Sequence, residues 1–189
     1  MTFGLKGPEW KYDDTGRSPA YFSSREHAVV SRALLDELRE VSIAAGKLNI
    51  RLCVHNNPER ELQDMIILEY KDQKCRIPHK HTDSDERIEV LEGKILTLVF
   101  DDSGNLLDQT VLCPEENFIY RNPINRHHVY FPLTERIIFS ETRGGKFDRK
   151  SLISPDWDPA VVLTRHLPAE DLVCHSRGCK TPCKLLNHP

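Results

Sequence analysis

Three histidines and one glutamate in this sequence have the residue types and the spacing of a metal site. His79 and His81 form an HxH pair, Glu86 follows after a short loop, and His128 comes later in the chain. Residues two apart in a β-strand face the same side, so His79 and His81 project together. Glu86 begins the next expected strand and His128 opens a later one. All four side chains can therefore meet around one ion in a rolled-up sheet.

This set of side chains favours one divalent transition metal (Fe, Mn, Ni, Co, Cu or Zn) over calcium. Four protein ligands leave one or two positions open for water, dioxygen or a chelating substrate, which is what catalysis requires. His127 is an alternative to His128. Because adjacent residues of a strand face opposite sides, only one of these two histidines can point inward.

The elements expected to position these residues are short strands with frequent turns. No helical pattern interrupts them, which is typical of an antiparallel sandwich or barrel. The expected strands are Asn49–His55, Gln63–Tyr70, Cys75–His81, Arg87–Leu91, Lys94–Phe100, Leu106–Leu112, Phe118–Arg121, His128–Phe131 and Arg136–Glu141.

One amphipathic helix is expected ahead of the strands. Ser23 and Ser24 can cap its start, apolar residues then recur at helical spacing, and Gly46 suits its end. The pattern predicts a helix of roughly twenty residues whose apolar face packs on the outside of a sheet. The 22 residues at the N-terminus have no periodicity and are expected to form an irregular arm.

The expected organisation is one domain with extensions. Residues 1–47 form the N-terminal arm and helix packing on the barrel, residues 48–150 the barrel, and residues 151–189 an irregular C-terminal extension with a cysteine cluster. A net charge of −3 without a basic block argues against nucleic acid as a partner. The apolar runs are too short for a membrane span, and the absence of a secretory signal indicates the cytoplasm.

The segment Pro78–Gly93 resembles the first sequence motif of the cupin superfamily. In the second motif Pro123 and His128 match, whereas Asn117 and Asn125 stand where the family has glycine. Asparagine is the non-glycine residue that best tolerates a positive φ, so the turn geometry can survive. The family spacing from Pro123 favours His128 over His127 as the ligand.

Residues 48–148 are similar more narrowly to the small cupin metalloproteins of the WbuC family, which are associated with surface-polysaccharide gene clusters. The similarity includes the hairpin Phe100–Gly104 and the closing segment Glu141–Asp148. It implies a mainly β fold, the cupin double-stranded β-helix or jelly-roll barrel, with the metal inside one mouth. It supplies no reaction, because the chemistry of that family is poorly defined.

Three further residues are candidates for a substrate pocket. Tyr130 shares the strand face of His128, while His55 and Arg51 can line the pocket or bind an anionic group. Each has an ordinary alternative: a core role for Tyr130, a strand-end role for His55 and a solvated position for Arg51.

A second metal site is a candidate in the tail, where thiol and imidazole ligands cluster. The spacing lacks a paired CxxC, so free thiols are the alternative. The residues are Cys174, His175, Cys179 and Cys183.

These features predict a metal-dependent enzyme that acts on a small oxygen-rich molecule such as a sugar or sugar acid, by isomerase or oxygenase chemistry. Two alternatives stay open. One is a non-catalytic ligand-binding or regulatory cupin, and the other is an interaction protein whose tail docks elsewhere. Exposed sheet edges favour a homodimer.

Overall fold

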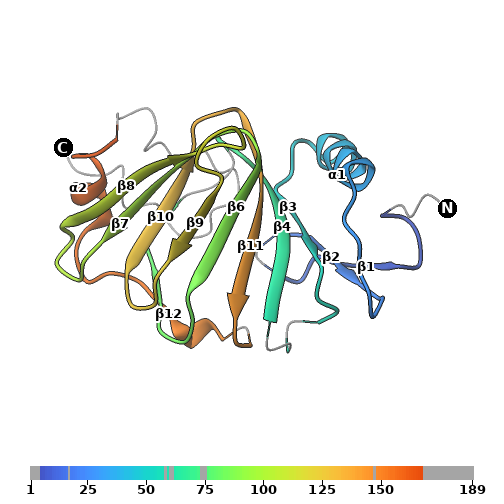
Figure 1. Ribbon diagram of the computed structural model, residues 1–189, viewed down its shortest axis with the longest axis horizontal. Helices are drawn as coiled ribbons and strands as arrows, with labels where there is room; N and C mark the ends of the chain where they lie inside the picture. Colours follow the sequence, from blue (N-terminus) through green and yellow to red (C-terminus); the bar gives the residue numbers. More distant parts are fainter. Residues whose placement is uncertain are drawn as a thin grey trace.

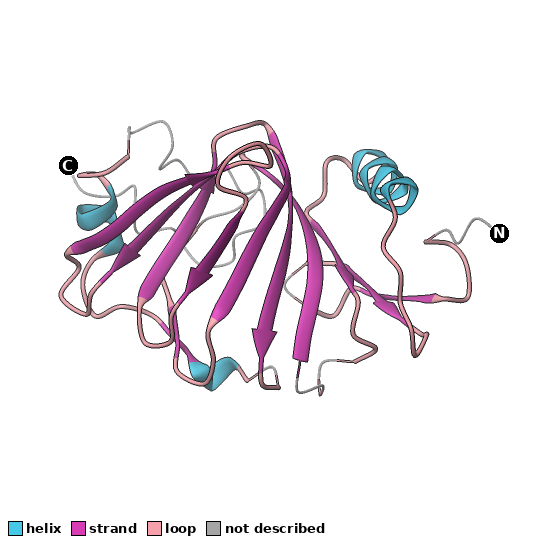
Figure 2. Cartoon of the chain, viewed as in Figure 1, coloured by secondary structure: helices cyan, strands magenta, loops and turns pink. Residues whose placement is uncertain are grey.

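Two facing β-sheets make up most of the protein (Figures 1 and 2). The computed structural model describes residues 5–16, 18–57, 59, 62–72, 76–146 and 148–167. The elements are β1 (Trp10–Asp13), β2 (Ala20–Ser23), α1 (Arg32–Ala44), β3 (Ile50–Cys53), β4 (Leu62–Tyr70), β5 (Lys80–His81), β6 (Glu86–Glu92), β7 (Ile95–Phe100), β8 (Leu106–Leu112), β9 (Ile119–Asn122), β10 (His127–Pro132), β11 (Arg136–Gly144), η1 (Arg149–Ser151), β12 (Leu152–Ile153) and α2 (Pro159–Leu163).

The first sheet has the strand order β1-β2-β3-β4-β11-β6-β9, and the second has the order β10-β7-β8. Strand β5 pairs with β12, and a single bridge between His79 and His128 joins this pair to β10. All named strand pairs are antiparallel except β2 with β3. The predicted fold class, mainly β with a jelly-roll arrangement, is confirmed.

A buried apolar cluster fills the space between the two sheets. Ile88 and Phe139 come from the first sheet, while Ile95 and Leu112 come from the second. Residues directly opposite each other on paired strands share a face. A residue of β4, β9 or β11 that lies opposite an inward-facing residue on the neighbouring strand therefore also points into this interior.

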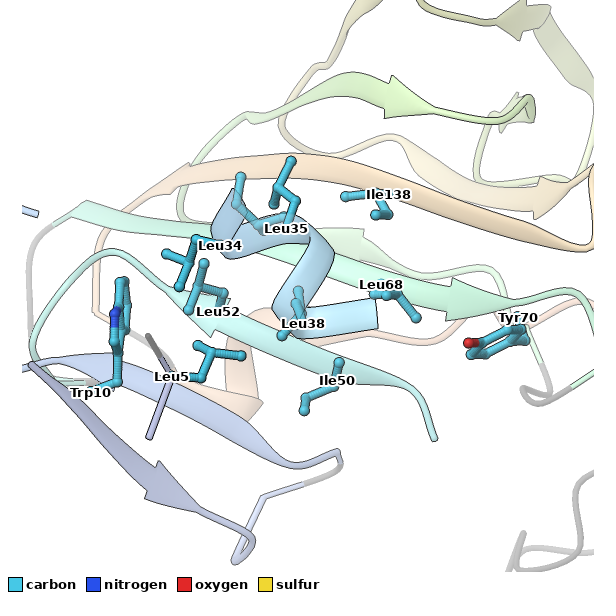
Figure 3. Close-up of a cluster of buried hydrophobic side chains, with 11 residues drawn as sticks. Leu5, Trp10, Leu34, Leu35, Leu38, Ile50, Leu52, Leu68, Tyr70 and Ile138 are labelled. Atoms are coloured by element: carbon cyan, nitrogen blue, oxygen red, sulfur yellow. The ribbon is translucent and has the colours of Figure 1, made fainter. Parts of the chain in front are cut away.

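Helix α1 covers the outer face of the first sheet, as expected, but it is shorter than predicted. Leu34, Leu35 and Leu38 pack against β3, β4 and β11 (Figure 3). The helix starts at Arg32, because the Ser31 side chain, rather than Ser23 or Ser24, accepts the hydrogen bond from the Leu34 amide. The prediction of a helix of roughly twenty residues was therefore wrong at its N-terminal end.

The prediction of an irregular N-terminal arm was also wrong. Residues 10–13 and 20–23 form β1 and β2, which extend the first sheet beyond β3. Backbone pairing with β3 orders these short segments even though their side chains show no alternation. An unpaired sheet edge exposes amides and carbonyls, so pairing the β3 edge satisfies groups that would otherwise face solvent.

The described part of the C-terminal extension contains short ordered elements, while residues 168–189 lie outside the described residues. Strand β12 pairs with β5, and α2 places Val162 and Leu163 on the outer face of the second sheet. Trp157 also joins this cluster, with its ring 5.3 Å from that of Phe100. The division of the chain at residues 47 and 150 stays a prediction.

Two observations bear on the other predictions made from composition. Among the described residues, neither helix is long and apolar enough to cross a bilayer. Cys53 and Cys113 are buried free thiols, and burial raises the pKa of Cys53 to about 12. Cys75 and the tail residues Cys174, His175, Cys179 and Cys183 lie outside the described residues.

Candidate metal centre

The four predicted ligands come together in the interior of the protein. One donor atom from each of His79, His81, Glu86 and His128 lies within 4.8 Å of the others. His81, Glu86 and His128 are buried, and His79 is partly buried. The three imidazole centroids are 4.8–5.4 Å apart. Residues from three strands and one bridge therefore form one cluster.

Backbone hydrogen bonds fix the two histidine-bearing segments beside each other. The His79 amide donates to the His128 carbonyl at 3.1 Å, and the His128 amide donates to the His79 carbonyl at 2.8 Å. The turn before β10 is held in the same way, because the Asn125 amide donates to the His81 carbonyl at 2.8 Å. Asn125 has a φ of 62°, so the prediction that asparagine replaces a glycine in this turn is confirmed there.

Glu86 enters the cluster from a row of paired residues across the first sheet. It lies opposite Asn122 on β9 and opposite Arg143 on β11, so the three side chains share the inner face. Asn122 donates from Nδ2 to Glu86 Oε1 at 3.0 Å, and His81 Nε2 lies 3.0 Å from Glu86 Oε2. His128 Nε2 lies 3.5 Å from Oε1. The carboxylate is thus at the centre of the group.

Two of the imidazoles present a nitrogen lone pair to the cluster. His79 Nδ1 lies 3.3 Å from the Ile77 carbonyl and His128 Nδ1 lies 3.1 Å from the Arg126 carbonyl. A carbonyl only accepts, so the hydrogen of each neutral ring is on Nδ1 and the lone pair is on Nε2. His128 Nε2 is buried without a hydrogen-bond partner. Both rings have the tautomer that binds a metal through Nε2.

His81 has the opposite arrangement. Its Nδ1 lies 3.1 Å from Arg143 Nη1, and a guanidinium only donates. The neutral ring therefore carries its hydrogen on Nε2, where it donates to Glu86. A cation at this nitrogen would displace that hydrogen. Arg143 also donates from Nη2 to a second acceptor, Asp83 Oδ2, at 3.1 Å.

The residues present fit a transition-metal ion. Two ligands on opposite sides of an ion with bonds of about 2.1 Å are about 4.2 Å apart, so the observed separations need only a small contraction. The donor set of three imidazoles and one carboxylate is the one that borderline divalent ions prefer. The nearest partner of the buried His128 Nε2 is Glu86 Oε1 at 3.5 Å, beyond good hydrogen-bond geometry, so a cation would supply a better one.

The electrostatics of the cluster favour a carboxylate beside a protonated imidazole when no cation is bound. Burial alone would raise the pKa of Glu86, but contacts with His128 and His81 lower it well below its usual value. Burial alone would lower the pKa of His128, but the Glu86 charge and contact raise it. For His79, burial and the His128 charge together lower the pKa to about 4.

These shifts predict how metal affinity depends on pH. Above pH 6.5, Glu86 is ionised and His79 is neutral, whereas His128 keeps a proton up to its raised pKa. That proton competes with the ion, so we expect affinity to rise with pH through the window above 6.5, with about one proton released by His128. Chelator competition titrations in several buffers measure both quantities. An affinity that stays flat in this window would contradict the assignment.

His127 lies on the opposite face of β10 from the cluster. Its ring packs edge-on against Trp157, with 5.8 Å between centroids, and its Nδ1 lies 3.4 Å from Asp102 Oδ1. The structure thus places His128, and not its neighbour, among the four.

Tyr130 faces the interior on the same strand as His128. Its ring packs against Phe139 at 5.1 Å between centroids, and the Arg76 guanidinium lies 5.9 Å from the ring centroid. Burial and the charges of Glu69 and Glu141 raise its pKa well above the usual value, so the hydroxyl keeps its proton. Its role as a pocket residue stays a prediction.

Arg51 and His55 make contacts away from the cluster. Arg51 donates from Nη2 to the Ser18 carbonyl, and His55 Nδ1 lies within 3.1 Å of backbone atoms of Asp64. The His55 ring also packs edge-on against Phe22. Within the described residues, neither side chain makes a hydrogen bond, ion pair or ring contact with the four candidate ligands, and their assignment to a pocket stays a prediction.

Asn122 and Arg143 are two members of the site that the sequence did not reveal. Each contacts a ligand only because strand pairing places it opposite Glu86. Arg143 belongs to the segment Glu141–Asp148 that carries the WbuC resemblance, which offered one signal. Asn122 immediately precedes Pro123 of the second motif, but nothing in the sequence states the register that brings it to Glu86.

Comparisons with known proteins locate this chain only broadly. A family model described as a domain of unknown function (DUF6016) matches residues 30–112, which include three of the four cluster residues. A search of curated proteins found no match.

Several solved structures have a similar backbone. The capsular polysaccharide assembling protein CapF from Staphylococcus aureus has 14% identity and a TM-score of 0.46, covering 57% of this chain and 30% of its own. KdgF from Halomonas sp. has 17% identity and a TM-score of 0.41, and the match covers 53% of this chain and 81% of KdgF. Oxalate decarboxylase from Lactobacillus farciminis has 19% identity and a TM-score of 0.41, and the match covers 57% of this chain and 32% of the decarboxylase.

This chain thus spans about a third of CapF or less. We transfer neither ligand nor reaction from these proteins. The class of protein that the chain's own fold and cluster define is a jelly-roll protein with a His3Glu group able to hold a metal. This agrees with the cupin resemblance of its sequence.

Proposed function

We propose that this protein binds one divalent transition metal through His79, His81, Glu86 and His128. It would use this ion to act on a small oxygen-rich molecule. The observation that carries the proposal is the convergence of four ligand-type side chains inside the jelly roll, three of them buried. Burying an ionised carboxylate is costly unless it is paired, so a buried Glu86 among three imidazoles is expected where a cation binds.

The bound ion would supply Lewis-acid polarisation of a carbonyl or hydroxyl oxygen. The chain's own residues would do the rest. Asn122 and the two neighbouring histidines orient the Glu86 carboxylate, while Arg143 and Asp83 hold His81 from behind. Tyr130 adds a protonated hydroxyl-bearing ring to the same interior. Such a site suits isomerisation or oxidation of a sugar or sugar acid.

The resemblance to the WbuC proteins supports a substrate from surface-polysaccharide metabolism. A cytoplasmic location and a homodimer stay predictions. The runner-up function is a non-catalytic cupin that binds the same class of molecule to sense it or to regulate a partner.

Elemental analysis of anaerobically purified protein tests the proposal. We expect about one transition-metal ion per chain, as in other single-ion sites. The metal-loaded protein is then incubated with sugars and sugar acids and followed by NMR. Conversion of one compound supports the enzyme, whereas saturable binding with the compound returned unchanged supports the runner-up. A protein that neither retains nor takes up a divalent ion would overturn both.

A further inference from the structure

Asn122 has one amide atom engaged with the cluster and one without any partner. It is 1% exposed at the end of β9. Its Nδ2 donates to Glu86 Oε1 at 3.0 Å, whereas its Oδ1 is buried without a hydrogen-bond partner. Burying an amide oxygen without a partner is unfavourable. Asn122 Oδ1 therefore offers an unused hydrogen-bond acceptor next to the Glu86 carboxylate.

The orientation of the amide follows from Glu86. Glu86 Oε1 accepts the hydrogen bond from Asn122 Nδ2 at 3.0 Å, and Glu86 Oε2 lies 3.0 Å from His81 Nε2. An ionised carboxylate only accepts, so the amide NH2 must face it and the amide oxygen must be turned away. Oδ1 is bonded to the same carbon as Nδ2, so it is fixed next to Glu86 and can only accept a hydrogen bond.

The backbone around Asn122 holds this orientation. Asn122 is the register partner of Glu86 between β6 and β9. The turn that follows is tied back by Asp85, which accepts from the Ile124 amide at 2.7 Å and from Arg121 at 2.8 Å. The Asp85 carboxylate therefore stabilises the turn that follows Asn122.

We propose that Asn122 is a positioning and specificity-determining residue, and this inference rests on the proposed metal site. Nδ2 holds Glu86 in place for the ion, and Oδ1 accepts a hydrogen bond from an O–H group of the molecule bound beside it. The site therefore takes chelators that carry a hydroxyl, such as 2-hydroxy acids and polyols, in preference to chelators of the same size and charge that only accept.

Co²⁺-loaded full-length protein provides the test, with lactate and pyruvate as probes. The two are monoanions of similar size, but only lactate has a hydroxyl next to its carboxylate. Visible absorption of the bound Co²⁺ reports the dissociation constant of each. We expect lactate to bind more tightly than pyruvate. In Asn122→Ala this preference should fall about fivefold, the effect of one lost hydrogen bond.

The same variant tests the other half of the proposal. Removing a side chain that hydrogen-bonds to a metal ligand typically lowers metal affinity by about 10–100-fold, so Asn122→Ala should weaken Co²⁺ binding within that range. Asn122→Asp keeps an acceptor of the same shape and loses the donor, so it should keep the lactate preference while its Co²⁺ affinity changes. Asn117→Ala, at an exposed asparagine whose Nδ2 reaches only the Val111 carbonyl at 3.5 Å, is the matched control.

The outcomes separate this inference from the proposed function. If the wild-type protein binds no Co²⁺, the proposed metal site is wrong, and the proposed function is overturned with it. Wild-type protein that binds Co²⁺ but not lactate in preference to pyruvate overturns only the role of Oδ1. An Asn122→Ala protein with unchanged Co²⁺ affinity and unchanged preference overturns the whole inference. Circular dichroism shows whether each variant is folded, and the isosteric Asn122→Asp provides the comparison if Asn122→Ala is not.

Discussion

Replacing His128 with alanine is expected to lower metal affinity by more than about a hundredfold, whereas replacing the adjacent His127 should leave it near the wild-type value. Loss of a side chain that only hydrogen-bonds to a ligand already lowers metal affinity by about 10–100-fold, so loss of a ligand itself must lower it more. The two histidines are neighbours on β10 but face opposite sides, since His128 is in the cluster and His127 packs on Trp157. Chelator competition on both purified variants measures the difference.

His127→Ala is a demanding control because it also removes buried packing. We expect it to lower the melting temperature through its contact with Trp157 while metal affinity stays unchanged. His128→Ala should lower metal affinity, and its cation-free form should also be less stable, because the buried Glu86 carboxylate loses a partner. Equal losses of affinity in both variants would show that the effect comes from general damage to β10, and the ligand assignment would then be wrong.

The second large effect is expected from shortening the chain. A protein ending at Asp148 lacks β12, Trp157 and α2, and should lose both metal affinity and its cooperative unfolding transition. Burying one Val or Leu side chain contributes about 1.5–3 kcal/mol, so the three buried in this segment contribute about 5 kcal/mol or more. That is comparable to the whole stability of a small domain, about 5–15 kcal/mol. The three are Val162, Leu163 and Leu167.

Loss of β12 also acts directly on the site. The Ser151 carbonyl accepts from the Thr82 amide at 3.1 Å, next to His81. A chain ending at Leu167 is the matched control, because it keeps every described contact and removes only residues 168–189. Differential scanning calorimetry and metal titration compare the two shortened chains with the full chain. If the chain ending at Leu167 loses one metal ion and the cluster variants do not, the cysteine tail is the metal site.

The convergence of the four candidate ligands could be predicted from the sequence because part of their spacing reflects local strand geometry. His79 and His81 are two apart, so alternation points them to the same side, and the short loop before Glu86 returns the chain to the same place. His128 required the resemblance to a second motif, since a strand far along the chain can pair anywhere. The turn at Asn125 was predictable because asparagine tolerates a positive φ, and its φ of 62° agrees.

The residues around the ligands were not predictable because they depend on register between distant segments. Asn122 and Arg143 reach the cluster through pairing with Glu86, which no local pattern encodes. The same reason applies to β1 and β12, which are short strands ordered by their neighbours. The start of α1 was misplaced because the apolar residues after Ser24 were taken as helical, whereas Val29 is 75% exposed and precedes Arg32, the first residue of the helix.

The pairing of β5 with β10 and β12 also orders events during synthesis. His79, His81 and Glu86 leave the ribosome well before His128 and the segment Ser151–Ile153 that borders β5. Contacts between distant segments form late, because the connecting chain must close first. A nascent chain still awaiting β10 has only part of the proposed ligand set, so we expect it to bind the proposed ion less tightly than the complete chain.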